Sequence, residues 1–160
     1  MKAETIATLV LVFNPQGRVL LGRKKNGEIG VGLLNAPGGK WDRKETILEC
    51  AARELQEEAG IIVTTGNLRH LGSVKCCVGN KLIQLVHVYA TTEYSGSPRE
   101  TDSMKDFDWY SPAKLPLDRM HEGDRFWFPK AARRQKFRMQ IWYERPGAGY
   151  IKHVEGDYNS

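Results

Sequence analysis

Apolar and polar positions divide the chain into many short strand-like runs and one longer helix-like stretch. Runs rich in β-branched and aromatic residues, bounded by Gly, Pro or Asn, predict strands. They cover residues 5–13, 18–23, 33–36, 61–64, 70–78, 81–92, 107–110, 137–143 and 150–154. The second run is expected to return beside the first as a hairpin, after a turn at residues 14–17. Gly79-Asn80 favours another hairpin, and the long apolar run that follows it is typical of a central strand.

Residues 47–59 have the spacing of an amphipathic helix, because apolar side chains recur every three or four positions. These side chains are Ile47, Leu48, Ala51, Ala52, Leu55 and Ala59. Thr46 and Glu49 predict a capping box at the start of the helix, and Gly60 predicts a C-terminal cap.

The later part of the chain has weaker helical patterns. They predict one helical turn over residues 112–115, ended by Pro116, and a helix over residues 121–134 that is kinked or begins at Pro129. Polar loops are expected over residues 24–32 and 93–105, a turn over residues 146–149, and a frayed C-terminus. The whole pattern predicts one mixed α/β (α+β) domain spanning residues 1–160.

Three acidic side chains share one face of the predicted helix. Glu54 and Glu58 are four residues apart, and Glu57 is three from Glu54, so the carboxylates are neighbours. Like charges at this spacing destabilise an isolated helix by about 0.2–0.5 kcal/mol per pair. Two interpretations follow from the residues alone: a solvated acidic face, or, with a carbonyl of the preceding Gly38-Gly39 pair, an oxygen-rich site for Mg²⁺ or Mn²⁺.

The spacing of fixed residues around this helix resembles the signature of the Nudix hydrolases. The signature is Gly, five residues, Glu, seven residues, then Arg-Glu-apolar-x-Glu-Glu-x-Gly-apolar. Every position is filled, by Gly39, Glu45, Arg53, Glu54, Leu55, Glu57, Glu58, Gly60 and Ile61. Beyond the signature, residues 8–25, 35–40, 86–91 and 126–129 resemble the oxidised purine nucleoside triphosphatase (8-oxo-dGTP diphosphatase) group of this family. The implied fold is a mixed β-sheet sandwiched between helices.

The resemblance implies a metal-assisted attack of water on a diphosphate bond, with Mg²⁺ or Mn²⁺ as cofactor. The implied metal ligands are the Gly38 carbonyl and the carboxylates of Glu54, Glu57 and Glu58. Either Glu54 or Glu58 would also accept the proton of the attacking water. Arg53 and Glu45 are expected to orient these glutamates.

The resemblance also implies residues that bind substrate: Thr8, Lys24, Asn35, Lys40, His121, Asp124 and Trp127. The two lysines would meet phosphates, and Asn35 and Asp124 would contact the purine edge. His121 stands where the group has a tryptophan, and Gly123 where it has an aspartate, so the implied choice of base is relaxed.

A further acid from a loop is implied for the triphosphatases, and here its position is Ser103. Glu100 and Asp102 are the nearby candidates to replace it. His87, inside a predicted strand, is expected to be a core residue.

The charge and the cysteine content of the chain indicate the kind of partner and the cellular compartment. The net charge of +5 at pH 7 suits an anionic partner. The basic residues of the late segment are expected to form a solvated face: Lys130, Arg133, Arg134, Lys136 and Arg138. The three cysteines, Cys50, Cys76 and Cys77, do not suggest a disulfide framework, so a cytoplasmic protein is expected. The apolar start of the chain is interpreted as a strand rather than a signal peptide.

The function that the resemblance implies is Mg²⁺-dependent hydrolysis of oxidised purine nucleoside triphosphates such as 8-oxo-dGTP to the monophosphate and pyrophosphate. The alternative enzyme is a Nudix hydrolase acting on another nucleoside diphosphate derivative: a nucleotide sugar, a dinucleotide or a capped RNA. A binding module with a degenerate site and an RNA-binding protein are hypotheses of other classes. No membrane association and no stable nucleic-acid partner are expected, because the chain has neither a long apolar run nor a nucleic-acid motif.

Overall fold

Two β-sheets form the centre of the computed structural model, which describes residues 2–27, 29–145 and 148–157. The larger sheet has the order β4-β1-β6-β5-β8-β9, and the smaller one β3-β2-β7. The pairs β1/β6 and β5/β8 are parallel and all other pairs are antiparallel. The strands are β1 (Thr5–Val12), β2 (Val19–Lys24), β3 (Leu34–Asn35), β4 (Gly38–Lys40), β5 (Arg69–Val78), β6 (Lys81–Thr91), β7 (Met104–Tyr110), β8 (Phe137–Arg145) and β9 (Ala148–Asp157).

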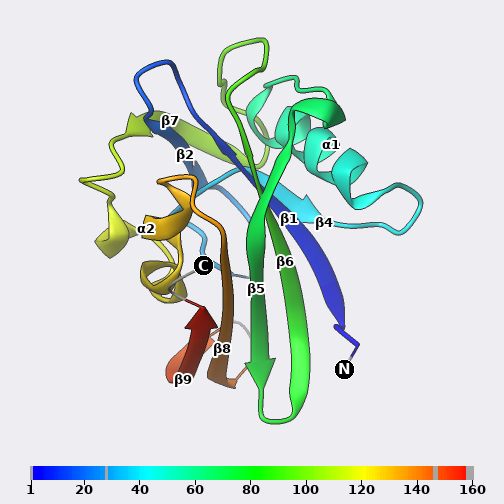
Figure 1. Ribbon diagram of the computed structural model, residues 1–160, viewed down its shortest axis with the longest axis vertical. Coiled ribbons are helices and arrows are strands. Elements are labelled where there is room, and N and C mark those ends of the chain that lie inside the picture. The colour runs from blue at the N-terminus through cyan, green and yellow to red at the C-terminus, as the bar shows by residue number, and fades with distance from the viewer. Residues whose placement is uncertain (1, 28, 146–147, 158–160) are drawn as a thin grey trace.

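Helical segments cover both faces of these sheets, as Figure 1 shows. The long helix α1 (Ile47–Ala59) lies on one face, and the short α2 (Phe128–Ala131) lies on the other. Three 3₁₀ helices complete the chain: η1 (Thr65–Asn67), η2 (Leu117–Arg119) and η3 (Glu122–Phe126). The expected mixed sheet between helices is confirmed, and none of the helices in the described ranges is long and apolar enough to cross a membrane.

Side chains along β1 and β2 point alternately to the two faces of the sheets, which explains why a helical segment packs on each face. Val10, Val12 and Leu20 face α1, where they pack with Leu55 and Tyr89. Their chain neighbours Leu11, Val19 and Leu21 point to the opposite face, in the cluster that contains Phe128 of α2 and Ile141 of β8. Because successive side chains of a strand point to opposite faces, both faces of the sheets are apolar and both need a helical cover.

The predicted hairpin between residues 5–13 and 18–23 is wrong. Phe13 and Val19 form a single bridge, after which the chain enters the second sheet, where β2 pairs with β3 and β7. The edge of β1 is taken instead by β4, a strand that the glycine pair did not suggest. The central position of β6 and its hairpin with β5 are confirmed.

Several weaker predictions also need correction. Residues 61–64 are not a strand, because only Ile62 forms a bridge, with Ser95. The expected helix over residues 121–134 is instead η3 followed by the four-residue α2, which has Pro129 in its first turn. Residues 112–115 form a turn, and the helical residues come after Pro116, in η2. Strand β7 begins three residues earlier than expected. The predicted turn at residues 146–149 and the C-terminal end fall partly or wholly outside the described residues.

Candidate active site

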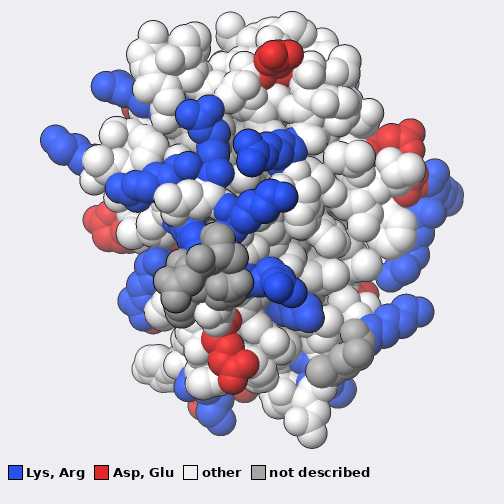
Figure 2. All heavy atoms as spheres, in the orientation of Figure 1, with Lys and Arg blue, Asp and Glu red and all other residues white. Residues whose placement is uncertain are grey.

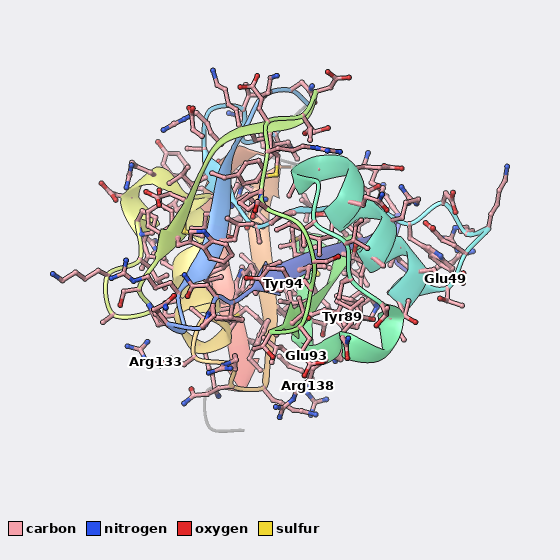
Figure 3. All side chains as sticks on the ribbon, turned by 90° about the horizontal axis from the view of Figure 1, so that it is seen from above. Glu49, Tyr89, Glu93, Tyr94, Arg133 and Arg138 are labelled. Atoms are coloured by element: carbon pink, nitrogen blue, oxygen red, sulfur yellow. The ribbon has the colours of Figure 1, made fainter. Side chains whose placement is uncertain are left out.

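Helix α1 begins and ends as its sequence predicts. The Thr46 hydroxyl accepts a hydrogen bond from the Glu49 N–H at 3.1 Å, and the Glu49 carboxylate accepts one from the Thr46 N–H at 2.9 Å. Gly60 ends the helix with φ at 75°, a left-handed conformation that suits glycine. Figure 3 shows Glu49 at the outer end of α1 and Tyr89 beside the helix. These caps fix where the acidic face of α1 starts and stops.

Arg53 joins three of the glutamates of the signature. Its guanidinium donates to the Glu45 carboxylate through Nε at 2.9 Å and Nη2 at 2.6 Å. Its Nη1 lies 2.8 Å from Glu54 Oε1 and 3.1 Å from Glu57 Oε2. The hydrogen bonds that Arg53 donates to Glu45 lower the pKa of the Glu45 carboxyl, and those that it donates to Glu45 and Glu54 raise the pKa of Arg53. These contacts agree with the orienting role expected for Arg53 and Glu45, which stays a prediction.

The glycine pair lies at the open edge of the larger sheet, as strand β4. Val10 N donates to Pro37 O and Trp41 N to Ile6 O, with Gly38 opposite Leu9. This register places Gly38 in a pair without mutual hydrogen bonds, so its carbonyl points away from β1. A side chain at Gly38 would overlap the Thr8 backbone, and one at Gly39 would overlap the Glu54 carboxylate.

Glu54 and Glu58 experience each other's charge. Burial, followed by the negative charge of Glu54, raises the pKa of Glu58 to about 7. Burial also raises the pKa of Glu54, against the lowering effect of Arg53. Neither an ion pair nor a hydrogen bond engages the Glu58 side chain within the described ranges. Carboxylates that repel each other at the edge of a sheet are a donor set that suits a hard divalent cation.

The carboxylates of α1 are not already gathered as a cage. Among the described residues, no three Asp, Glu, His or Cys side chains stand together as ligands of one ion. Glu54 and Glu57 are instead engaged by Arg53. The oxygen chemistry of these side chains fits a metal ion, but the Glu54 carboxylate fills the space against Gly39. The side chains of Glu54, Glu57 and Glu58 would therefore have to turn to surround an ion. Their assignment as ligands stays a prediction.

A second group of polar residues comes from β3 and from the segment around η3. A bridge between Leu34 and Met120 brings Asn35 next to His121. The Asn35 side-chain oxygen accepts from the Ala36 N–H at 2.9 Å, which leaves its amide N–H groups to donate. His121 Nδ1 accepts from the Gly123 N–H at 3.2 Å. Asp124 keeps part of its surface open, but burial raises its pKa to about 7. The structure thus brings Asn35, His121 and Asp124 to one region.

The charge of Lys24 acts on both groups of residues. It opposes the rise in the Glu58 pKa that burial causes, and it adds to the lowering of the His121 pKa by burial. Its Nζ donates to the Ile29 carbonyl at 2.6 Å. Lys40, the other lysine expected to meet phosphate, is exposed at the end of β4. Both assignments stay predictions.

Two of the predicted substrate-binding residues are buried. The Thr8 side chain is fully buried, with its hydroxyl 3.5 Å from Gly39 O and 3.6 Å from Cys50 Sγ. It therefore supports the glycine pair from inside. Trp127 is 3% exposed and stacks on Phe137, with ring centroids 5.3 Å apart. A hollow of about 290 Å³ beside this stack contains no carboxylate: its lining is Arg125, Phe126, Trp127, Pro129, Lys130, Phe137 and Met139.

The candidate loop acids lie beside the end of α1. The Thr101 hydroxyl donates to the Glu58 carbonyl at 2.8 Å, which ties the loop to the helix. Glu100 is paired with Lys25 Nζ at 3.0 Å and is largely exposed. The Asp102 carbonyl accepts from the Asn26 side chain at 2.6 Å. The role of either acid in catalysis stays a prediction.

His87 is not a core residue. It is half-buried, and its Nδ1 lies 3.2 Å from Nε2 of the exposed His70 on the neighbouring strand. Burial lowers the pKa of both imidazoles, which favours two neutral rings. One ring nitrogen of the pair then donates the hydrogen bond and the other accepts it. Sequence periodicity alone did not reveal the partner, because the pair forms across two strands.

Two residues near Asp124 were not selected from the sequence. Tyr143, on β8, packs its ring edge-on against His121 at 5.8 Å. Cys76, on β5, is close enough to Asp124 and Tyr143 for their charges to interact. Each lay inside a predicted strand, and neither carried a local signal of function. All three cysteines are free thiols, as expected.

Basic side chains gather on the face where Figure 1 draws α2 and the start of β8, as Figure 2 shows. Arg133, Arg134, Lys136 and Arg138 are exposed, which agrees with a solvated face. Arg133 and Arg138 lie well away from the start of α1 at Glu49 in Figure 3.

Comparison with known proteins found a family, curated relatives and similar structures. A family model described as the NUDIX domain matches residues 3–131. The chain is 40% identical over 138 residues to the oxidized purine nucleoside triphosphate hydrolase of Danio rerio, a match that covers 86% of this chain and 85% of that protein. The Mus musculus protein of the same name is 38% identical over 138 residues, with the same coverage. The structure resembles that of a MutT protein from Bacillus halodurans, with a TM-score of 0.77, 22% identity, and coverage of 98% and 99% of the two chains.

Proposed function

The chain belongs to the Nudix hydrolase family, and on that premise we propose that it is a Mg²⁺-dependent nucleotide pyrophosphohydrolase of oxidised purine nucleoside triphosphates such as 8-oxo-dGTP. The names of the fish and mouse relatives support this choice of substrate. The observation that carries the proposal is the arrangement of acids on α1, where Glu54 lies against Gly39 and its charge acts on Glu58. Carboxylates placed in this way suit a divalent cation that binds a polyphosphate.

The reaction adds water across the bond between the α- and β-phosphates. A new bond forms between the water oxygen and phosphorus, the bridging oxygen leaves with pyrophosphate, and the monophosphate remains. Nudix hydrolases generally use divalent cations, and here Gly38, Glu54, Glu57 and Glu58 would hold Mg²⁺, which neutralises phosphate charge and acidifies bound water.

We assign the proton of the attacking water to Glu58. Burial and the charge of Glu54 raise its pKa to about 7 in the protein without a metal ion, which supports its assignment as the proton acceptor. Arg53 engages Glu54, which makes Glu54 the better-fixed carboxylate and the weaker base. Lys24 and Lys40 are assigned to the phosphates, and Asn35 and Asp124 to the edge of the base.

One observation favours the alternative substrate class, another nucleoside diphosphate derivative such as a nucleotide sugar, a dinucleotide or a capped RNA. Gly123 presents no side chain where the resemblance implies an acid, and Ser103 replaces the implied loop acid. A site with fewer hydrogen-bonding groups discriminates less between bases.

A substrate panel tests the proposal. With Mg²⁺, hydrolysis of 8-oxo-dGTP and dGTP is compared with that of a nucleotide sugar, a dinucleotide and a capped RNA, and the products are identified. Monophosphate and pyrophosphate from the purine triphosphates are expected, with loss of activity on chelation. Faster turnover of a non-triphosphate would favour the alternative, and equal rates for 8-oxo-dGTP and dGTP would refute preference for an oxidised base.

The Glu58→Gln variant tests the general base. Loss of the proton acceptor is expected to lower kcat by about 10²–10⁴-fold while the fold is kept. Glu93→Gln, a change to an exposed acid away from α1, is the matched control. Near-normal turnover of folded Glu58→Gln would remove the assigned role.

The cellular setting stays part of the proposal. The free thiols of Cys50, Cys76 and Cys77 support a reducing compartment such as the cytoplasm. There, hydrolysis of damaged triphosphates would keep them out of newly made nucleic acid.

A further inference from the structure

The Tyr143 hydroxyl stands in the space that a side chain at position 123 would fill. A Cβ built on Gly123 would overlap this hydroxyl and would lie 3.1 Å from Ile141 Cδ1 and 3.5 Å from His121 Nδ1. Gly123 is buried in η3, and Tyr143 is on β8. Two segments far apart in the sequence are therefore fitted to each other: a glycine on one makes room for a phenol from the other.

The surroundings of this hydroxyl are polar and partly open. Tyr143, His121, Asp124 and Cys76 all keep some exposed surface. Burial raises the pKa of Tyr143, and the charges of Cys76 and Asp124 add to the effect, so the phenol is neutral. In the described part of the chain, no hydrogen bond involves the Tyr143 hydroxyl, and its ring contacts His121 edge-on. A neutral hydroxyl beside a half-open acid is placed to meet a ligand.

The neighbouring groups have defined hydrogen-bonding roles. His121 Nδ1 accepts from the Gly123 N–H, and burial lowers the His121 pKa, so the neutral ring carries its proton on Nε2 and donates there. Asn35 has amide N–H groups to donate. An ionised carboxylate only accepts, whereas a hydroxyl both donates and accepts. Tyr143 is the one group of this set that serves either role without a change of protonation.

We infer that the Tyr143 hydroxyl contacts the purine base and determines which bases the protein accepts, an inference that rests on the proposed function. Ring nitrogen N7 of an ordinary purine accepts a hydrogen bond, whereas the same atom of an 8-oxopurine carries a proton and donates one. A rotating hydroxyl satisfies both forms. The residue pair Gly123 and Tyr143 therefore replaces a selective acid with a group that tolerates ordinary and oxidised purines.

Removal of the hydroxyl tests the inference. Tyr143→Phe is expected to lower kcat/KM about three- to tenfold for both 8-oxo-dGTP and dGTP, because the change removes one neutral hydrogen bond. An indole deoxyribonucleoside triphosphate has the shape of a purine without its hydrogen-bonding edge, and its kcat/KM should not change. Tyr150→Phe, which removes a hydroxyl from a tyrosine that is 79% exposed, is the control.

A second variant tests the fit between the two segments. Gly123→Ala pushes the Tyr143 hydroxyl out of its place and should weaken hydrolysis of both purines. In the Tyr143→Phe background the same alanine meets no hydroxyl, so it should cost less than in the wild type. Equal costs in the two backgrounds would show that the hydroxyl does not occupy this space.

The outcomes separate the inference from the proposed function. If the wild-type protein hydrolyses no triphosphate, the proposed function fails. If it does, and Tyr143→Phe leaves both purines unchanged or slows all three substrates equally, the function stands and the base contact is refuted. A loss confined to one purine would refute the claim that the hydroxyl serves both forms.

Discussion

The ion pair between Arg53 and Glu45 should contribute measurably to stability, although most ion pairs at protein surfaces do not. Two hydrogen bonds, at 2.9 and 2.6 Å, join the guanidinium to the carboxylate. The side chain of Glu45 is 13% exposed and that of Arg53 is 32% exposed, so water screens the pair only in part. Arg53→Lys keeps the charge but loses the fork that contacts both oxygens.

The expected cost follows from these contacts. A hydrogen bond to a charged group contributes about 1.5–3 kcal/mol. Lysine keeps one such bond of the two, and the exposed third of Arg53 reduces the loss, so Arg53→Lys should lower the free energy of unfolding by about 2 kcal/mol. Glu57, whose side chain is 59% exposed, should matter little, and Glu57→Gln should cost less than about 1 kcal/mol.

A double-mutant cycle measures the pair. Urea unfolding at pH 7 of the wild type, Arg53→Lys, Glu45→Gln and the double variant should give a coupling energy of about 1–2 kcal/mol. Turnover should also fall in Arg53→Lys, because Arg53 holds Glu54 as well. Costs that add within about 0.5 kcal/mol would show that the two side chains do not act together, and would refute the structural reasoning.

Two further predictions concern stability. Thr46→Ala removes the capping hydroxyl and one half of the capping box, so thermal or urea unfolding should show a loss of about 1 kcal/mol, which Thr46→Ser should largely restore. Asp124 has a pKa raised to about 7 by burial, so its contribution to stability is full below pH 4 and is lost as the pH rises through 7. Asp124→Asn should therefore gain stability relative to the wild type as the pH is raised from 5 to 8, and an unchanged difference over this range would contradict the assignment.

The signature helix was predictable because its determinants are local. Thr46, Glu49 and Gly60 act on backbone groups within four residues, and the structure has the helix at the expected ends. The return of β2 into a second sheet was not predictable, because a hairpin between β1 and β2 satisfies the same local pattern. Only the competition of β4 for the edge of β1 decides between them.

The residues of the candidate site also divide into those predictable from local sequence and those that depend on the packing of distant segments. Arg53 and its glutamates are neighbours in sequence, so their contacts follow from helical spacing. Tyr143 comes to Gly123 across twenty positions through the packing of β8 under η3. A missing side chain at Gly123 was visible in the sequence, but the residue that fills its place was not.

The acids assigned to hydrolysis and the residues assigned to the base come from different elements, which has a consequence for redesign. The carboxylates come from α1, whereas Asn35 comes from β3, His121 from the start of η3 and Tyr143 from β8. Substitutions in the second set should alter which nucleotide is held and leave the acids of α1 in place. The specificity of this protein should therefore be open to engineering without a change to the residues assigned to its reaction.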